Sequence, residues 1–283
     1  MLAVLIARDI VDLGAPDYSL QDLLDEWGES SFDLERDAIV CEAGEGEIVA
    51  YASVRRPAGY AAVAPGHEGR GIGHSLLSWS EQRQRELGWE RHRHAAAARN
   101  SRARGLLTGA GYGLVRSYFR LCRPLGDVPI IPVVPAGIRM RAPRPRADAE
   151  VLHALDAAAF SQSADYQEMS LEEFAERHLA AHDVEPSLSC VAVREDRVAG
   201  FLLSRRWDQE SAGYVDLLAV HPDQQRRGVG SALLLTAFER YRAAGLSEAR
   251  LGVASDNPGA LALYTRLGMR ETFRIDIYER ALG

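Results

Sequence analysis

Apolar residues gather in short runs along the second half of the chain, and these runs have the length and residue types of strands. Each is rich in aliphatic or aromatic residues and lies next to turn-forming or charged residues, a combination that favours extended structure. The runs predicted to be strands cover residues 137–141, 197–204, 213–220, 249–254 and 270–280.

Polar positions between these runs carry signals for helix ends. Ser170 and Glu173 have the spacing of a capping box, which begins one helix. A long helix is expected from about Gly230 to Gly245, because glycine readily takes the left-handed conformation that ends a helix. Asn257 can cap a third helix. Strands that alternate with helices in this way predict an α/β layered architecture.

The same order of signals occurs twice in the chain. Four positions of the first half recur 157 residues later without a gap, as Gly71, Gly73, Asn100 and Gly111 match Gly228, Gly230, Asn257 and Gly268. Such self-similarity predicts two related domains. The first copy has no counterpart of the run 137–141, so its sheet is expected to begin one strand short.

A proline-rich segment separates the two copies, and its prolines disfavour a helix in that part of the chain. We therefore predict an N-terminal domain at residues 1–126, a linker at 127–136 and a C-terminal domain at 137–283.

Composition and charge exclude several classes of protein. The net charge of −7 argues against bulk nucleic-acid binding. No apolar run approaches the roughly 20 residues of a membrane-spanning helix, and no signal-peptide cleavage pattern is present, so a cytoplasmic protein without membrane contact is expected. The scattered cysteines suggest neither disulfides nor zinc, and Cys41, Cys122 and Cys190 are expected to be small buried side chains.

A basic cluster spans Arg91 to Arg104 but lacks interleaved aromatic residues that could stack on bases. We interpret it as a strand edge followed by a solvated helix face. His92 and His94 lack the companions of a metal site and are expected to be surface histidines. No metal ion is expected elsewhere either.

The sharpest local signal is a glycine-rich turn between an apolar strand and a helix. Glycines let backbone N–H groups approach a ligand closely, and the positive end of the following helix favours negative charge. This geometry suits a pyrophosphate, although glycines between a strand and a helix also occur in simple tight turns. The residues of the turn are Gln225, Arg226, Arg227, Gly228, Val229, Gly230 and Ser231.

This turn is similar to the [R/Q]xxGxG/A motif of the GCN5-related N-acetyltransferase (GNAT) family, and the resemblance extends over nearly the whole chain twice. The two-copy layout and the ending around 255–269 resemble mycothiol synthase and its actinobacterial relatives. The resemblance implies two tandem GNAT-type domains, each with a mixed, mostly antiparallel central sheet flanked by helices. It also implies an N-acetyltransferase that uses acetyl-CoA, acts on the primary amine of a small molecule, and is a monomer or homodimer.

The resemblance assigns roles to single residues of the second copy. Asp216 matches the position of a carboxylate base, with a salt-bridged surface aspartate as the alternative. Tyr264 matches the general acid, with a tyrosine packed in the core as the alternative. Asn257 matches a residue near the thioester, and the strand whose backbone pairs with the pantetheine arm is matched by Leu218, Ala219 and Val220.

The acceptor amine is expected to lie beside the segment 161–169 and the hairpin around Trp207. Acidic residues there suit a cationic acceptor, although solvated loop acids are the more ordinary explanation. These residues are Asp165, Glu168, Asp208 and Glu210.

The first copy has lost these chemical groups. At the repeat offset, Gly59 replaces the aspartate, Leu107 the tyrosine and Glu68 the leading glutamine. We therefore expect a catalytically degenerate N-terminal domain, in which residual acetyl-CoA binding without turnover is left open. A different class of function, a non-catalytic acyl-CoA-binding sensor or interaction module, also fits the loops.

Overall fold

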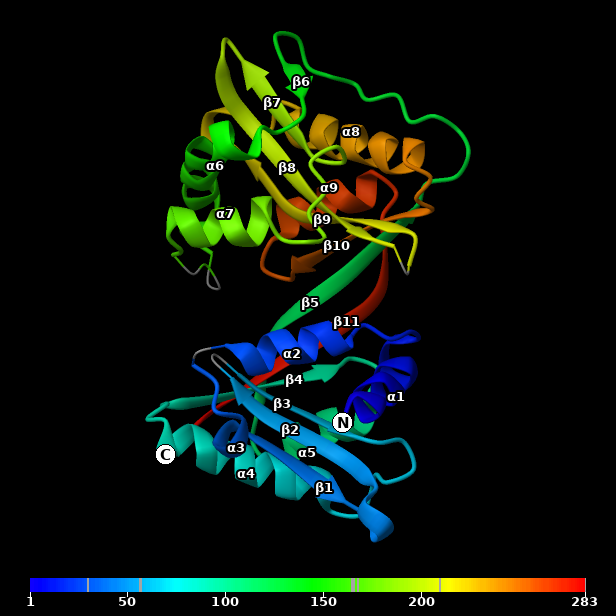
Figure 1. Ribbon diagram of the computed structural model, residues 1–283, viewed down its shortest axis with the longest axis vertical. Coiled ribbons are helices and arrows are strands. Elements are labelled where there is room, and N and C mark those ends of the chain that lie inside the picture. Colours follow the sequence, from blue (N-terminus) through cyan, green and yellow to red (C-terminus); the bar gives the residue numbers. More distant parts are fainter. Residues whose placement is uncertain (30, 56–57, 164–165, 167, 209, 283) are drawn as a thin grey trace. The chain divides into compact units, whose positions relative to one another are not determined.

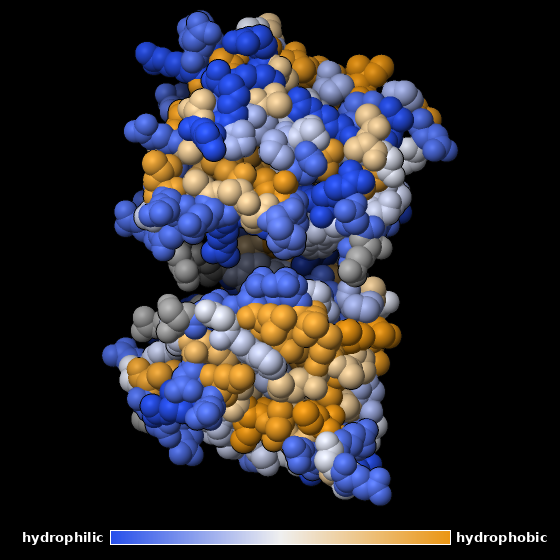
Figure 2. All heavy atoms as spheres, viewed as in Figure 1, coloured by the Kyte–Doolittle hydropathy of each residue, from blue (hydrophilic) through white to orange (hydrophobic). Residues whose placement is uncertain are grey.

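The computed structural model describes residues 1–29, 31–55, 58–163, 166, 168–208 and 210–282 (Figure 1). The chain divides into two compact units. Unit 1 comprises Met1–Phe119, Ala254–Asp256 and Thr272–Gly283, and unit 2 comprises Arg120–Val253 and Asn257–Glu271. Polar and charged side chains cover much of the visible surface of unit 2, whereas unit 1 shows broader apolar areas (Figure 2).

The elements that begin in the first copy follow one another in the predicted order. They are α1 (Leu2–Leu13), α2 (Leu20–Gly28), α3 (Leu34–Asp37), β1 (Ala38–Glu42), η1 (Gly44–Gly46), β2 (Ile48–Arg55), β3 (Ala58–Val63), α4 (Ile72–Glu86), β4 (Arg91–Ala97), α5 (Ser101–Gly109) and β5 (Gly113–Pro124).

The second copy has one additional strand at its start and no counterpart of α3, and its 3-10 helix follows the third strand of the repeat instead of the first. Its elements are β6 (Arg139–Arg141), α6 (Pro145–Phe160), α7 (Leu171–Leu179), β7 (Cys190–Arg194), β8 (Arg197–Trp207), β9 (Ala212–Val220), η2 (Pro222–Gln224), α8 (Val229–Ala243), β10 (Glu248–Ala254), α9 (Pro258–Arg266) and β11 (Arg270–Ala281).

Each unit contains a mixed sheet, which confirms the predicted fold class. The hydrogen-bonded order is β1-β2-β3-β4-β11-β5 in unit 1 and β5-β10-β9-β8-β7-β6 in unit 2. The pairs β3–β4 and β9–β10 are parallel, and the other described pairings are antiparallel. Among the described strands, the sheet of unit 1 begins at β1 and has no counterpart of β6, so it is one strand short as predicted.

Helices cover both faces of the sheet in unit 2. Leu152 of α6 and Phe174 of α7 pack on one face against Phe201 of β8. On the other face, the Ser204 hydroxyl lies 2.7 Å from the Tyr241 hydroxyl of α8. Side chains alternate along a strand, and Phe201 and Ser204 lie three positions apart, so they point to opposite faces of the sheet. The core is therefore divided into two layers by β8 and β9.

The predicted helix caps are present. Ser170 and Glu173 form the reciprocal capping box of α7, and the Asn257 side chain accepts from the backbone N–H of Ala260. Cys122 and Cys190 are buried, as predicted, whereas Cys41 is only half-buried.

The interpretation of His92 and His94 as surface residues is wrong. Their exposed fractions are 0% and 6%. Both lie on β4, which is an interior strand of the sheet between β3 and β11, and not an edge. His92 is held by Ser80, with the Nε2–Oγ distance at 2.8 Å, and by the Tyr112 hydroxyl at 2.5 Å from Nδ1. Helix α4 covers His92 through Ser80, and a neighbouring strand from the far end of the chain makes β4 an interior strand.

That neighbouring strand is β11. Residues Ile275–Ala281 pair antiparallel with β4 in unit 1, while Arg120–Pro124 of β5 belong to unit 2. The backbone N–H of Leu125 donates to Ser247 at 2.9 Å, within unit 2. Each compact unit thus includes a segment from the other half of the chain. The boundaries predicted at 126 and 137 divide the chain into continuous pieces, and they stay a prediction.

Among the described residues, no helix is both long and apolar enough to cross a bilayer. No group of three or more His, Cys, Asp or Glu side chains in the described part is arranged to hold a metal ion.

The exchanged strand gives a first testable prediction. A fragment of residues 1–126 lacks β11, so the inner edge of β4 would be unpaired and open to aggregation. We expect this fragment to aggregate or remain partly unfolded in size-exclusion chromatography and circular dichroism. Coexpression with a fragment of residues 254–283 should restore a compact species. A monomeric, fully folded 1–126 fragment would contradict the prediction.

Candidate active site in unit 2

A β-bulge places Asp216. In the antiparallel pairing of β8 with β9, Leu203 lies opposite Leu217 but Ser204 lies opposite Val215, so Asp216 is the extra residue. A bulge breaks the alternation of side chains and re-aims the residue that it carries. Asp216 consequently reaches His178 on α7.

Beyond the bulge, the parallel strands β9 and β10 part. Their ladder runs from the pair Ala212–Glu248 to Val215–Leu251 and ends there, although β9 continues to Val220 and β10 to Ala254. The edge of β9 from Leu217 to Val220 therefore receives no ladder bonds from β10. Backbone groups on such an edge are available to a ligand that lies along the strand.

The glycine-rich turn lies at the end of this open edge. Gly228, with φ of 83°, is the N-cap of α8, and Arg226 also has a left-handed backbone, with φ of 59°. A Cβ on Gly230 would lie 3.3 Å from Leu263 of α9, which explains why glycine is needed at this close helix contact. Val229 is buried under the turn.

The arginine side chains of the turn are available to a negatively charged ligand. Arg226 and Arg227 are exposed, and neither forms an ion pair within the described residues. The Gln225 amide donates to the Val220 carbonyl at 3.3 Å and so links the turn to the end of β9. Together with the unpaired N–H groups of α8, these arginines provide an anion-binding surface.

Asp216 is tied by two basic side chains. His178 Nδ1 lies 2.7 Å from Asp216 Oδ2, and Arg205 Nε lies 3.0 Å from Oδ1. Arg205 also pairs with Asp183 at 2.6 Å. Burial alone would raise the pKa of Asp216, but the hydrogen bond from His178 and the charge of Arg205 hold it below its usual range. Asp216 is therefore an ionised acceptor, which makes Nδ1 of His178 the donor.

His178 was not found from the sequence, although it is the closest partner of Asp216. It lies 38 residues before the aspartate and carries no motif. Among the described residues, its Nε2 has no hydrogen-bond partner. The His178 ring packs on the Phe174 ring, with their centroids 5.2 Å apart. His153 packs on the same Phe174 ring, at a centroid distance of 5.4 Å.

Asp156 of α6 is a second residue that sequence reasoning missed. It is 5% exposed, and its Oδ1 has no hydrogen-bond partner among the described residues. Burial raises the pKa of Asp156, the charges of His178 and His153 lower it, and that of Asp216 raises it. A buried carboxyl with a free oxygen therefore lies in the electrostatic reach of the His178–Asp216 pair.

Tyr264 lies on α9 and is 8% exposed. Burial and the nearby Tyr214 raise its pKa to about 12, so the hydroxyl keeps its proton at neutral pH. Its hydroxyl has no hydrogen-bond partner among the described residues. Asn257 directs its side-chain oxygen to the start of α9, which gives it a structural task as a cap.

The acidic residues expected near an acceptor are solvent-exposed where the structure describes them. Glu168, Asp208 and Glu210 are exposed, and Asp208 pairs with Arg206 at 2.6 Å. Asp165 lies outside the described residues. Trp207 stacks on Tyr214, with ring centroids 4.3 Å apart.

Unit 1 lacks the bulge. Its strands β2 and β3 pair without a register shift, and Gly59 lies directly opposite Val54. A Cβ on Gly59 would overlap the Ser80 hydroxyl and would lie 3.3 Å from His92. An aspartate therefore has no room at this position, and Leu107 replaces the tyrosine.

The two units share one order of strands, and in each the parallel strands part beside a glycine-rich helix start. This is the architecture of a coenzyme-dependent acyltransferase. Residues 8–112 and 151–269 match the model of the acetyltransferase (GNAT) family, and the chain belongs to that family. It is an N-acetyltransferase of the GNAT family, whose members use acetyl-CoA as co-substrate.

Several relatives are similar over most of the chain. A mycothiol acetyltransferase of Streptomyces bingchenggensis is 31% identical over 87% of this chain and 81% of its own length. A mycothiol acetyltransferase of Rhodococcus jostii is 34% identical over 78% of this chain and 73% of its own.

Solved structures agree with the tandem fold. A GCN5-related N-acetyltransferase from Sphaerobacter thermophilus is 26% identical, covers 99% of this chain and 91% of its own, and has a TM-score of 0.84. A tandem GNAT protein from the clavulanic acid biosynthesis pathway covers 97% of this chain and 93% of its own with a TM-score of 0.70, and at 16% identity it supports the fold alone.

The lowered pKa of Asp216 gives a prediction for stability. A folded-state pKa below the unfolded value of about 3.9 stabilises the protein fully above that pH, and the contribution is lost as the pH falls through the folded pKa. Asp216→Asn should therefore lower the thermal unfolding midpoint by several degrees at pH 7 and by progressively less below about pH 4. The exposed Asp208→Asn should change little at either pH. An equal loss for Asp216→Asn at pH 3 and pH 7 would contradict this assignment.

Proposed function

We propose that unit 2 transfers the acetyl group of acetyl-CoA to the primary amine of a small molecule by direct attack. The observation that carries this proposal is the bulge at Asp216, after which β9 leaves β10 and runs open to the turn at Gly228. Unit 1 has neither the bulge nor the aspartate and tyrosine, so the reaction is assigned to unit 2 alone.

The residues of unit 2 fit acetyl-CoA. Backbone groups of Leu218, Ala219 and Val220 lie on the open edge of β9, where an amide-bearing pantetheine arm can pair as an additional strand does. The pyrophosphate would lie at the start of α8, near Arg226 and Arg227. Backbone N–H groups of the same open edge would stabilise the oxyanion of the tetrahedral intermediate.

His178 is the proton acceptor in this proposal, and Asp216 positions it. The carboxylate already receives hydrogen bonds from His178 and Arg205, and with a lowered pKa it is a weak base. Because Nδ1 donates to Asp216, Nε2 of the neutral ring carries the free lone pair. Imidazole is well suited to proton transfer near neutral pH, and the aspartate stabilises the imidazolium that forms.

Tyr264 completes the transfer. The ammonium group first releases one proton to solvent. The neutral amine nitrogen then forms a bond to the thioester carbon, its second proton goes to His178, and the carbon–sulfur bond breaks. Tyr264, which remains protonated with a pKa of about 12, donates its proton to the departing thiolate.

A cationic acceptor suits the charge around this pair. An amine arrives largely as an ammonium ion, and the carboxyl group of Asp156 interacts electrostatically with both His178 and Asp216. The relatives named mycothiol acetyltransferases make a cysteinyl glucosaminyl inositol the first amine to test.

The function is tested by CoA release from acetyl-CoA across a panel of amines that includes cysteinyl glucosaminyl inositol. One amine should be turned over, and Gly228→Glu should abolish turnover, because it forces a side chain into a left-handed position and adds negative charge at the turn. Gly71→Glu, the same change in unit 1, is the matched control and should retain turnover. Acetyl-CoA binding without turnover of any amine would instead support the sensor function.

The mechanism is tested by steady-state kinetics of single variants. His178→Gln should lower kcat/KM by about 10²- to 10⁴-fold. His153→Gln, which changes a histidine on the same Phe174 ring but not in contact with Asp216, should stay near the wild-type kcat/KM. Tyr264→Phe should lower kcat with little change in the KM for acetyl-CoA. A kcat/KM near wild type in His178→Gln, together with a large loss in Asp216→Asn, would assign the base to the carboxylate.

A further inference from the structure

The open edge of β9 gives acetyl-CoA a direction in unit 2. In the proposed function, the diphosphate lies at the turn before Gly228, at the far end of this edge. The pantetheine arm then runs back along β9 and brings the acyl group to the end where β9 and β10 part, after the ladder pair Val215–Leu251. His178 contacts Asp216, the residue that follows this pair on β9, so the proton acceptor lies at the same end.

Tyr214 lies on one face of the sheet at this closed end. A Cβ on Gly213 would overlap the Tyr241 ring of α8, so Gly213 faces α8 and the adjacent Tyr214 points to the face on which α6 and α7 pack. The Tyr214 hydroxyl lies 3.2 Å from the position of a Cβ on Gly252. Because Gly252 is the first residue of β10 beyond the last ladder pair, the phenol reaches from β9 to β10 where the strands part.

Buried side chains close the other face at this point. Leu251 and Val253, the neighbours of Gly252 on β10, are both buried. Since side chains alternate along a strand, these two point to the face opposite to that of Tyr214. An acyl chain longer than acetyl therefore has to extend on the face that carries Tyr214.

Two neighbours hold the Tyr214 ring in place. The ring stacks on that of Trp207, with the centroids 4.3 Å apart and the planes 12° from parallel. The guanidinium carbon of Arg120 lies 5.1 Å from the centroid of the Tyr214 ring and 5.3 Å from that of the Trp207 ring. Stacking and cation–π contacts both favour one orientation of the ring. The ring cannot turn aside for a longer acyl chain without breaking these contacts.

We propose that Tyr214 limits the length of the acyl group that unit 2 accepts, so that the site binds acetyl-CoA and discriminates against donors with longer acyl chains. Trp207 and Arg120 are positioning residues, because they act through the Tyr214 ring. This inference rests on the proposed function, which brings the acyl group to the closed end of the parted strands.

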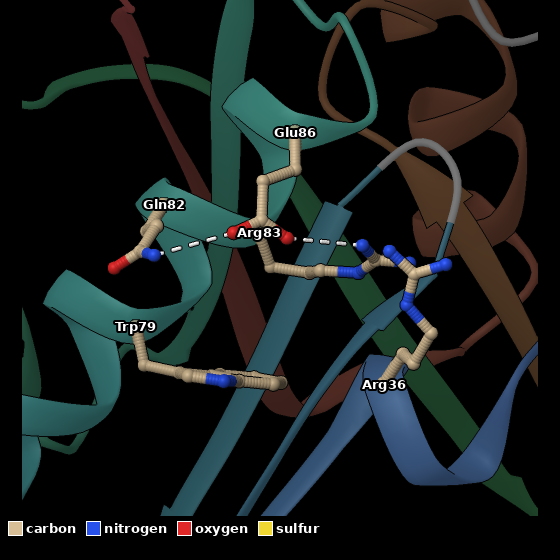
Figure 3. A pocket seen from close by; sticks show the side chains of 5 residues that line it. All are labelled: Arg36, Trp79, Gln82, Arg83 and Glu86. Atoms are coloured by element: carbon tan, nitrogen blue, oxygen red, sulfur yellow. Dashed lines mark hydrogen bonds and ion pairs between the residues drawn. The ribbon is translucent and has the colours of Figure 1, made fainter.

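Unit 1 offers a matched tryptophan for the test. This tryptophan, on α4, lines a hollow of about 210 Å³ together with polar and charged side chains (Figure 3). The lining residues are Trp79, Arg36, Gln82, Arg83 and Glu86. Because Trp79 lies in unit 1 and the stacked pair of Trp207 and Tyr214 lies in unit 2, a change at Trp79 leaves that pair intact.

The test is isothermal titration of the full chain with CoA, acetyl-CoA and butyryl-CoA. Only the binding equivalent that Gly228→Glu removes is assigned to unit 2. At this site, wild-type protein should bind butyryl-CoA about tenfold more weakly than acetyl-CoA, or weaker still, since a closed pocket discriminates by about 10- to 200-fold per methylene. Tyr214→Ala should remove this difference, and Tyr214→Phe, which keeps the ring, should retain it.

Two tryptophan variants test how the ring is held. Trp207→Ala should reduce the preference for acetyl-CoA over butyryl-CoA, because Tyr214 loses its stacking partner. Trp79→Ala should leave the preference at its wild-type value. CoA carries no acyl group, so unchanged CoA binding serves as the folding control for every variant.

Two results would overturn the proposal. One is equal affinity of the wild-type site for acetyl-CoA and butyryl-CoA, and the other is a difference that persists in Tyr214→Ala. If Tyr214→Ala loses CoA binding, Trp207→Ala decides, and a preference equal to that of wild type overturns the proposal. A Gly228→Glu variant that keeps every binding equivalent would instead contradict the proposed function.

Discussion

The parting of β9 from β10 is the constraint on which the site depends. Parallel strands normally satisfy each other's backbone groups, so an interrupted ladder leaves donors and acceptors that need another partner. Here the interruption follows Val215, next to the bulge at Asp216 and ahead of the turn that begins α8. One local irregularity thus lies where the strand edge opens and directs the Asp216 carboxylate to α7. The open edge then ends near the start of α8.

The two copies show what that irregularity contributes. Both retain parted parallel strands and a left-handed glycine before the long helix, at Gly71 and Gly228. Only β9 is bulged, whereas β3 pairs with β2 in regular register. In unit 1, Ser80 and His92 occupy the space beside Gly59, so the same fold has no room there for a counterpart of Asp216.

Electrostatics around Asp216 change the chemistry expected of a carboxylate at this position. A buried carboxylate is costly unless it is paired, and Arg205 and His178 provide the pairing. The same contacts that keep Asp216 ionised weaken it as a base and fix the tautomer of His178. The proposed base is therefore not the residue found by its position in the family pattern but a neighbour that no pattern revealed.

Local signals in the sequence determined much of this protein. The capping box at Ser170, the cap at Asn257, the glycine-rich turn and the repeat each depend on a few adjacent residues or on a fixed offset, and the structure contains them. The missing first strand of unit 1 was predicted for the same reason. Only the tertiary structure decided the bulge at Asp216, the contact with His178, the burial of His92 and the pairing of β11 with β4. These features depend on which distant segments become neighbours, and apolar periodicity records that a face is buried but not which partner buries it.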